Sequence, residues 1–209
     1  VLKKYSILRI GNLKHVLLNR LPFFREVDKE ILSEQEATFV SLGLDRNKAL
    51  FKINEICMKE FNQTYSEMNG MWSEHLVLFA ALSDSQFKIA SILEIGTFKA
   101  ETTLILSRIF PSASIISIDL TNEELSRSRV YEYIFSDITK AVGDRNELIN
   151  RNRSIEFKEI NSLNLISWQE KFDLIWIDGD HLAPVSTLDI YNSLRLLSDR
   201  GIALCDDVY

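Results

Sequence analysis

The chain has 209 residues, a formal net charge of −6 and 46% hydrophobic residues, which is typical of a globular protein with one main domain. The acidic balance argues against a nucleic-acid-binding protein, because such domains usually carry a basic face. The two cysteines, Cys57 and Cys205, form no CxxC pair, so neither a disulfide framework nor a zinc site is indicated. No stretch reaches the roughly 18 apolar residues that a membrane span needs, and we therefore expect a cytoplasmic protein without a membrane span.

The first 70 residues have apolar positions at helical spacing, most clearly over 50–61, with breaks at Leu21–Pro22 and at Gly43. We predict a helical N-terminal segment over residues 1–70 that serves as a lid or as a dimer contact. Its basic start also fits a helix on a membrane surface, but a solvated helix face is the commoner explanation. Besides a small-molecule substrate, the partner we expect is a second copy of the chain, bound through these helices.

The pattern changes its period after a helical stretch at 72–87. An apolar run at 91–95 is followed by helical spacing at 101–110 and by a second β-rich run at 114–118, which together predict a strand, helix, strand unit. Between residues 121 and 153 lies a charged stretch that we expect to hold a crossover helix and an excursion. Further strands are predicted at 154–160, 172–177 and 201–205, with intervening elements at 163–168 and 184–197.

Because each of these five strands is nearly all apolar, we predict an α/β fold with a doubly wound, mostly parallel sheet that helices cover on both faces. We assign residues 71–209 to this domain. In such sheets, ligands bind outside the carboxyl ends of the strands. The residues that follow the five strands are polar: Glu94, Gly96 and Thr97, then Asp119, then Asn161 and Ser162, then Asp178, Asp180 and His181, and finally Asp206 and Asp207. Five polar ends in succession favour a binding site.

The first of these ends suits an amino-bearing ligand better than a dinucleotide. Gly96 lets the backbone turn tightly, and the helix beginning near Ala100 points free N–H groups into the same space. A dinucleotide fingerprint needs a second glycine where the chain has Phe98, and Glu94 would repel a pyrophosphate. An NAD-dependent oxidoreductase is therefore disfavoured.

Asp119 follows the second strand, where an acid can accept hydrogen bonds from both ribose hydroxyls of a nucleoside. The structural alternative is that Asp119 or Thr121 caps the next helix. Together with Glu94 and Gly96, the nucleoside interpretation is favoured.

The run from Glu94 to Gly96, with an acid closing the next strand, resembles the class I, Rossmann-like methyltransferases. The segments WIDGDH at 176–181 and GIALCDD at 201–207 resemble the small-molecule O-methyltransferase branch of that family. Within the branch, the chain is similar to the cephalosporin-hydroxylase-like and macrocin-type sugar O-methyltransferases. The resemblance covers about residues 72–209.

The resemblance implies methyl transfer from S-adenosylmethionine to an oxygen of a small polar molecule, such as a sugar or a hydroxylated metabolite. It implies that Glu94, Gly96 and Thr97 hold the methionine part of the cofactor, that Asp119 holds the ribose, and that Ser162 lies near the adenine. The other cofactor contacts that it implies are Phe98, Thr102, Leu120 and Asp178. It also implies Mg²⁺ as a possible second cofactor, bound by Asp178, Asp206 and Asp207, since hard carboxylate oxygens are what this ion selects.

The catalytic groups are left open by the sequence. Asp178 and Asp180 are both available as the first metal ligand, and the spacing does not decide between them. His181 is the histidine closest to these acids, and histidine side chains titrate near neutral pH, which suits a general base. The alternative is that His181 caps the following helix or contacts the cofactor. We name His181 and Asp180 as the candidate catalytic residues.

The sequence departs from the family at the cofactor loop, where Phe98 and Ala100 replace two common glycines. Family domains continue for two further strands and a helix beyond the fifth strand, so we expect the C-terminal strands of the fold to be missing here and the edge of the last strand to be open unless another segment or subunit covers it. The alternative function is a non-catalytic domain that keeps the fold as a binding or assembly module.

Overall fold

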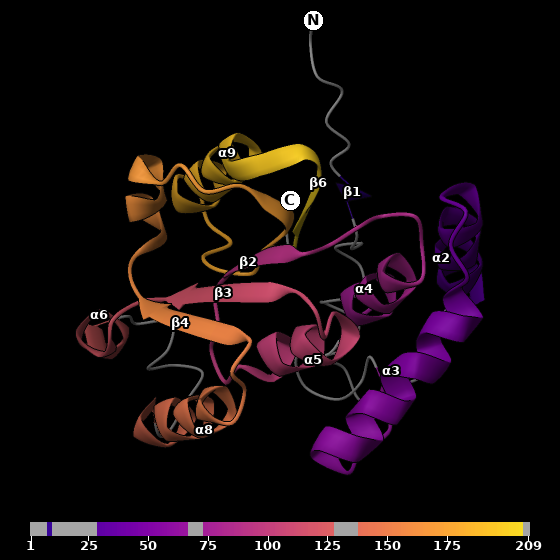
Figure 1. The fold of residues 1–209 in the computed structure, drawn as a ribbon, viewed down its shortest axis with the longest axis horizontal. Helices are drawn as coiled ribbons and strands as arrows, with labels where there is room; N and C mark the ends of the chain where they lie inside the picture. The colour runs from indigo at the N-terminus through magenta and orange to yellow at the C-terminus, as the bar shows by residue number, and fades with distance from the viewer. Residues whose placement is uncertain (1–7, 10–28, 67–72, 128–137, 207–209) are drawn as a thin grey trace, which may run out of the picture. The chain divides into compact units, whose positions relative to one another are not determined.

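The structure is a computed structural model, which describes residues 8–9, 29–66, 73–127 and 138–206 (Figure 1). The described residues divide into two compact units. One unit contains the sheet, with residues 8–9, 89–127 and 138–206, and the other contains the helices of residues 29–66 and 73–88. None of the described helices has the length and apolar character required to cross a membrane.

The helical unit consists of α2 (Lys29–Ser41), α3 (Arg46–Phe61) and α4 (His75–Ser83). The helix predicted over 50–61 lies inside α3, which begins earlier because the Asp45 carboxylate accepts a hydrogen bond from the Lys48 N–H at 2.9 Å and caps the first turn. The guanidinium of Arg46 donates to the Glu74 carboxylate, with Nε 2.6 Å from Oε1, and so joins α3 to the start of α4. A buried ion pair therefore fixes two helices of this unit against each other.

In the sheet unit, the described strands pair in parallel in the order β1-β6-β5-β2-β3-β4. The strands are β1 (Leu8–Arg9), β2 (Ser91–Ile95), β3 (Ser114–Asp119), β4 (Ile155–Glu159), β5 (Phe172–Ile177) and β6 (Leu197–Cys205). The chain steps outward from β2 to β4 on one side and from β5 to β6 on the other, so the strand order reverses between β2 and β5. Ligands of doubly wound sheets bind at such a reversal.

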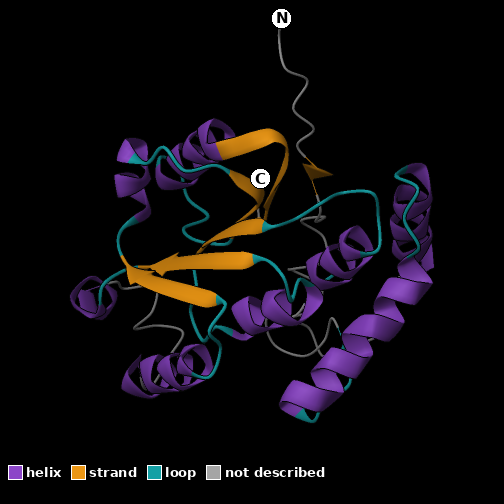
Figure 2. Cartoon of the chain, in the orientation of Figure 1, coloured by secondary structure: helices purple, strands orange, loops and turns teal. Residues whose placement is uncertain are grey.

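Helices cover both faces of this sheet, which confirms the predicted doubly wound α/β fold (Figures 1 and 2). The helical segments of the unit are α5 (Glu101–Ile109), α6 (Asn122–Arg127), α8 (Ile138–Asn150), the 3₁₀ helix η1 (Ser162–Ser167) and α9 (Val185–Leu196). Parallel crossovers are right-handed, and because the strand order reverses, α5 and α8 lie on one face and α9 on the other.

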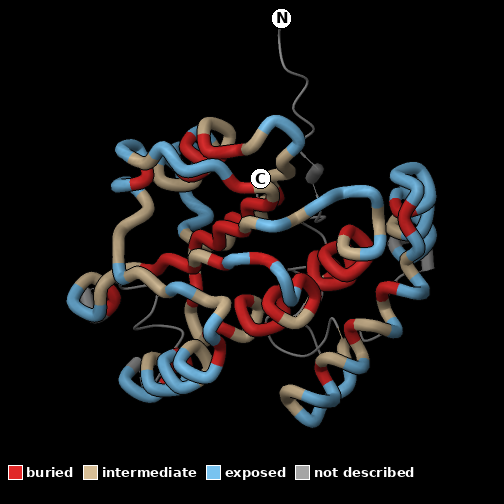
Figure 3. The backbone as a smooth tube through the Cα atoms, viewed as in Figure 1, coloured by how far each residue is buried: buried red, intermediate tan, exposed pale blue. Residues whose placement is uncertain are grey.

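The central strands carry the core, and their burial explains their continuous apolar sequences (Figure 3). On the α9 face, one cluster joins the strands to η1 and α9. Its buried members are Leu93, Ile95, Ile118, Leu165, Phe172, Ile175, Ile177, Leu196 and Leu197. This packing fixes the strand ends at which the predicted site residues lie.

The structure corrects one sequence prediction near the start of the chain and shows what covers the edge of the last strand. Leu8 and Arg9 are not helical but form β1, which pairs in parallel with Leu204 and Cys205 of β6. Of the two alternatives for the edge of β6, an open edge or one covered by another segment, the second is found at these two residues. A strand this short is determined by the free N–H and C=O groups of its neighbour, which its own sequence does not reveal.

Candidate active site

Glu94 is the centre of a buried hydrogen-bond network at the carboxyl end of β2. Its side chain is 1% exposed, and Oε2 accepts hydrogen bonds from Ser117 Oγ at 2.6 Å and from Thr103 Oγ1. Ser117 Oγ also lies 2.6 Å from Thr97 Oγ1. Because Ser117 is the register partner of Glu94 on β3 and Thr103 lies in the first turn of α5, three elements fix this carboxylate.

The other carboxylate oxygen of Glu94, Oε1, has no hydrogen-bond partner although it is buried. Burial raises the pKa of Glu94 to about 7, the hydrogen bonds from Ser117 and Thr103 oppose this rise, and the negative charge of Asp119 adds to it. A buried acceptor without a donor is unfavourable, and a ligand that supplies an N–H donor or a positive charge would satisfy it.

Asp119 holds the loop between β2 and α5. Its Oδ2 accepts from the backbone N–H groups of Phe98 at 2.8 Å and Thr97 at 3.2 Å, and its Oδ1 accepts from the N–H of Leu120 at 2.8 Å. Burial raises the pKa of Asp119, while these N–H groups and the charge of Arg145 oppose the rise. An ionised carboxylate has about four acceptor positions, so the predicted contact with a ribose is compatible with these bonds.

The capping alternative is realised by Thr121 and not by Asp119. Thr121 Oγ1 accepts from the Glu124 N–H at 3.2 Å, and the Glu124 carboxylate accepts from the Thr121 N–H at 3.0 Å. This reciprocal pair is a capping box at the start of α6. From the sequence alone, either residue could cap the helix. In the structure Thr121 is the cap, and Asp119 instead accepts hydrogen bonds from the loop between β2 and α5.

Gly96 brings the two central strand ends together. Its φ is +94°, and a Cβ at this position would lie 2.1 Å from the carbonyl oxygen of Asp178 and 2.9 Å from the Gly179 nitrogen. We predicted a glycine there for the approach of a ligand, and the group that approaches is the backbone of the turn after β5. The glycine is therefore required by the junction between β2 and β5.

Phe98 and Ala100 stand where the resembling family has glycines, and both adopt left-handed backbone conformations, with φ of 47° and 63°. The backbone of the loop thus adopts conformations that glycine usually provides, although neither position is a glycine. Left-handed conformations are unfavourable for residues with a Cβ, so the hydrogen bonds that the N–H groups of Thr97 and Phe98 donate to Asp119 offset local strain.

Asp178 and Asp206 follow neighbouring strands, since Ile177 pairs with Cys205 in the register of β5 and β6. Both are half-buried, with Asp178 N–H donating to the Ile95 carbonyl at 2.8 Å and Asp206 N–H to the Ile177 carbonyl at 2.9 Å. The third predicted metal ligand, Asp207, lies outside the described residues. Within the described ranges, no three or more histidine, cysteine or acidic side chains are grouped to hold a metal ion, so the Mg²⁺ site stays a prediction.

The two candidate catalytic residues lie on the exposed turn between β5 and α9. Asp180 Oδ1 accepts a hydrogen bond from the Leu182 N–H at 2.9 Å, so this carboxylate shapes the turn. His181 is exposed beside it. The predicted adenine neighbour, Ser162, is half-buried at the start of η1, and Thr102 is half-buried in the first turn of α5. All the predicted site residues that the structure describes lie at or just after the carboxyl ends of strands or in the first turn of α5.

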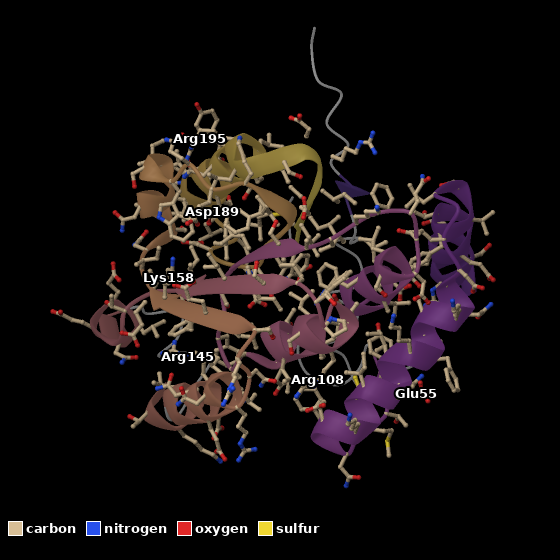
Figure 4. The ribbon with its side chains drawn as sticks, in the orientation of Figure 1. Glu55, Arg108, Arg145, Lys158, Asp189 and Arg195 are labelled. Carbon is tan, nitrogen blue, oxygen red and sulfur yellow. The ribbon has the colours of Figure 1, made fainter. Side chains whose placement is uncertain are left out.

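Arg145 is a buried residue next to the site that the charged pattern of residues 121–153 does not single out. Its side chain is 1% exposed, stacks on the ring of Phe157 at 4.2 Å from the ring centre, and pairs with Glu159 Oε1 at 3.3 Å (Figure 4). Glu159 is the register partner of Asp119. Arg145 thus supplies the positive charge beside two acids at the strand ends. The available signal was its position four residues after Ala141 on the same face of a helix.

A family model for a methyltransferase domain matches residues 93–208. No curated protein shows a significant match to the sequence. Among solved structures, the chain is similar to the SAH-bound methyltransferase PaMTH1 of Podospora anserina, at 19% identity over 89% of this chain and 73% of that chain, with a TM-score of 0.51. It is also similar to a "putative caffeoyl-CoA O-methyltransferase" from Staphylococcus aureus, at 16% identity over 93% of this chain and 73% of that chain, with a TM-score of 0.48. At these identities, the likeness to PaMTH1 shows a common fold.

Proposed function

The chain belongs to the methyltransferase domain family of the class I, Rossmann-like fold, and from this premise we propose that it transfers the methyl group of S-adenosylmethionine to an oxygen of a small polar molecule. When bound, S-adenosylmethionine supplies a methyl group activated by its positively charged sulfur. The observation that carries the proposal is the buried Glu94 carboxylate, whose Oε1 has no donor at the point where the strand order reverses. The SAH-bound state of PaMTH1 supports this cofactor.

The described residues fit the cofactor in charge and in hydrogen-bonding capacity. Glu94 Oε1 would accept from the amino group of the methionine part, and Asp119 retains acceptor positions for the ribose hydroxyls beside its three backbone bonds. Ser162 would lie near the adenine. The remaining contacts proposed are Gly96, Thr97, Phe98, Thr102, Leu120 and Asp178.

His181 is proposed as the general base. Its exposed imidazole lies on the turn after β5, and one of its ring nitrogens would take the proton of the acceptor hydroxyl as that oxygen is methylated. Asp180 would hold the turn in place through its hydrogen bond from Leu182. An oxygen acceptor is supported by the resemblance of 176–181 and 201–207 to O-methyltransferases.

Metal assistance is a separate part of the proposal, which is supported by the positions of Asp178 and Asp206 directly after the register partners Ile177 and Cys205 of β5 and β6. Mg²⁺ held there, with Asp207, would bind the acceptor oxygen and lower its pKa. The test is methyl transfer before and after treatment with EDTA. Lost activity that Mg²⁺ restores is expected, and unchanged activity would contradict a metal role while leaving the cofactor site intact.

The function is tested with methyl-labelled S-adenosylmethionine and a panel of small hydroxylated molecules, each paired with its amine and thiol counterpart. We expect label on the oxygen compounds and its loss with His181→Ala. Label on amines or thiols alone would contradict the oxygen acceptor. Cofactor binding with no transfer to any compound would favour the non-catalytic module.

A further inference from the structure

Helix α9 turns three polar side chains into the protein interior. Asp189, Asn192 and Ser193 are 1%, 2% and 0% exposed, and their i, i+3, i+4 spacing places them on one face of the helix. This face packs against η1, β5 and β6. Buried polar groups in proteins are nearly always hydrogen-bonded, so we ask which groups bind these three side chains.

Both carboxylate oxygens of Asp189 lack a hydrogen-bond partner, as do Asn192 Oδ1 and Ser193 Oγ. Asp189 is the most costly of the three, because its charged form is buried without a donor. Burial raises the pKa of Asp189, the nearby Ser162 hydroxyl opposes the rise, and the charge of Asp180 adds to it. Ser162 is thus close to the carboxylate but makes no hydrogen bond of ordinary geometry with it.

The surroundings of Asp189 connect it to two strand ends of the proposed site. A Cβ on Gly179, in the turn after β5, would lie 3.4 Å from Asp189 Oδ2. Ser162, at the start of η1, is a second neighbour of the carboxylate. Asp189, which is labelled in Figure 4, is therefore close to both segments that follow β4 and β5.

The opposite end of the same interface is firmly joined. Arg195, in the last turn of α9, donates from Nη1 to the Trp168 carbonyl at 2.6 Å and from Nη2 to the Leu165 carbonyl. Helix α9 is thus joined by hydrogen bonds to the end of η1. At the start of η1, by contrast, the Ser162 hydroxyl lies near the Asp189 carboxylate of α9, but neither oxygen of that carboxylate accepts a hydrogen bond. At the Arg195 end, both terminal nitrogens of the guanidinium have acceptors and only Nε lacks one, whereas at the Asp189 end neither carboxylate oxygen has a donor.

We propose that Asp189 is a positioning residue of the cofactor site, whose carboxylate accepts hydrogen bonds from the Ser162 hydroxyl and from the backbone of the turn at 179–181 when the cofactor binds. This inference rests on the proposed function. It explains an unpaired buried carboxylate as a group that is satisfied in the bound state and unsatisfied in the free state. Asp189 acts through Ser162 and the turn, and it does not touch the reacting atoms.

The test is Asp189→Asn in the full chain, with binding of S-adenosylhomocysteine measured by calorimetry and unfolding followed by thermal melting. We expect the melting temperature to equal or exceed that of the wild type, because a buried unpaired charge is removed, and the affinity to fall about 10- to 100-fold. Ser193→Ala is the matched control: it removes another unpaired group from the same helix face, and its affinity should stay at the wild-type value. Equal affinity of Asp189→Asn and the wild type would overturn the proposal.

Hydrogen exchange of the 179–182 amides gives a second readout that needs no variant to fold. Addition of S-adenosylhomocysteine to the wild type should protect these amides from exchange. A separate double-mutant cycle measures the coupling of the two side chains: Ser162→Ala should weaken binding, and the double variant with Asp189→Asn should bind no more weakly than Asp189→Asn alone. Bound cofactor with no added protection would contradict the inference alone. No binding to the wild type would instead contradict the proposed function.

Discussion

The two halves of the proposed site differ in how far their polar groups are satisfied. At the β2–β3 end, which comprises residues 94–98 and 117–120, the protein itself supplies hydrogen bonds to Asp119 and to one oxygen of Glu94. At the β5–α9 end, which comprises 178–181 and Asp189, the buried carboxylate has no donor and the turn residues Asp180 and His181 are exposed. The first end is preorganised, and the second depends on what binds.

This difference indicates that cofactor binding and acceptor chemistry depend on different parts of the site. Groups that are fixed before binding cost no reorganisation when a ligand arrives, so the β2–β3 end suits the part of the cofactor common to every turnover. Exposed groups on a turn suit the acceptor, which changes from reaction to reaction. Substitutions at the first end should therefore alter cofactor affinity, and substitutions of the exposed turn residues Asp180 and His181 should alter turnover.

The largest effect is expected where the two ends meet. Gly96→Ala would place a Cβ 2.1 Å from the Asp178 carbonyl oxygen, and backbone on both sides leaves little room to yield. We expect a loss of about 4 kcal/mol or more in the free energy of unfolding, measured by urea denaturation. The control is Gly143→Ala in α8, where a Cβ meets nothing within 4 Å and stability should rise by about 0.5–1 kcal/mol. Equal stability of the two variants would contradict the junction.

The separation of roles is tested next by His181→Ala. Loss of a general base typically lowers kcat by about 10²- to 10⁴-fold. Because His181 is exposed and lies outside the Glu94 network, the affinity for S-adenosylhomocysteine should not change. Steady-state kinetics and calorimetry on the same preparation check both expectations, and a fall in affinity equal to the fall in kcat would place His181 at the cofactor instead.

The Glu94 network predicts a particular dependence of stability on pH. In the folded protein, Glu94 keeps its proton up to a pKa of about 7, whereas in the unfolded chain it loses the proton near its ordinary value of 4.5. Between these values, the unfolded state binds fewer protons, so stability falls as pH rises, by on the order of 3 kcal/mol in total. Glu94→Gln lacks this contribution. Urea unfolding of both proteins at pH 5 and pH 7.5 should show the difference, and identical pH dependence would contradict the raised pKa.

A smaller effect is expected for Asp119→Asn, which keeps the shape of the side chain but presents one acceptor oxygen in place of two. At least one backbone N–H of the loop at Thr97 and Phe98 or of Leu120 then loses its acceptor. We expect a loss of about 1–2 kcal/mol in the free energy of unfolding and weaker binding of S-adenosylhomocysteine. Thr121→Ser, which retains the capping hydroxyl, is the control and should behave as the wild type.

The sequence predicted the fold where an element's own residues determine it. The strands at 91–95 and 172–177 were found because each is a mostly apolar run, which burial in a parallel sheet favours. The start of β6 was missed, because Ser198, Asp199 and Arg200 are polar and the pairing is irregular there. Its strand conformation depends on the neighbouring β5, which the local pattern does not contain.

The same limit applies to the site. Glu94 and Asp119 were identified by their places at strand ends, but their partners depend on register and on helix packing. Ser117 reaches Glu94 only because β2 and β3 pair in one particular register, and Asp189 reaches the turn after β5 only through the packing of α9. These contacts join residues that are distant along the chain, and a single sequence carries no direct signal of them.

The central claim, that the β2–β3 end binds S-adenosylmethionine, is tested most directly by calorimetric titration of the wild type, His181→Ala and Asp119→Asn with S-adenosylhomocysteine. We expect one molecule bound per chain, equal affinity for the wild type and His181→Ala, and weaker binding for Asp119→Asn. Absence of binding to the wild type, or full affinity in Asp119→Asn, would contradict it.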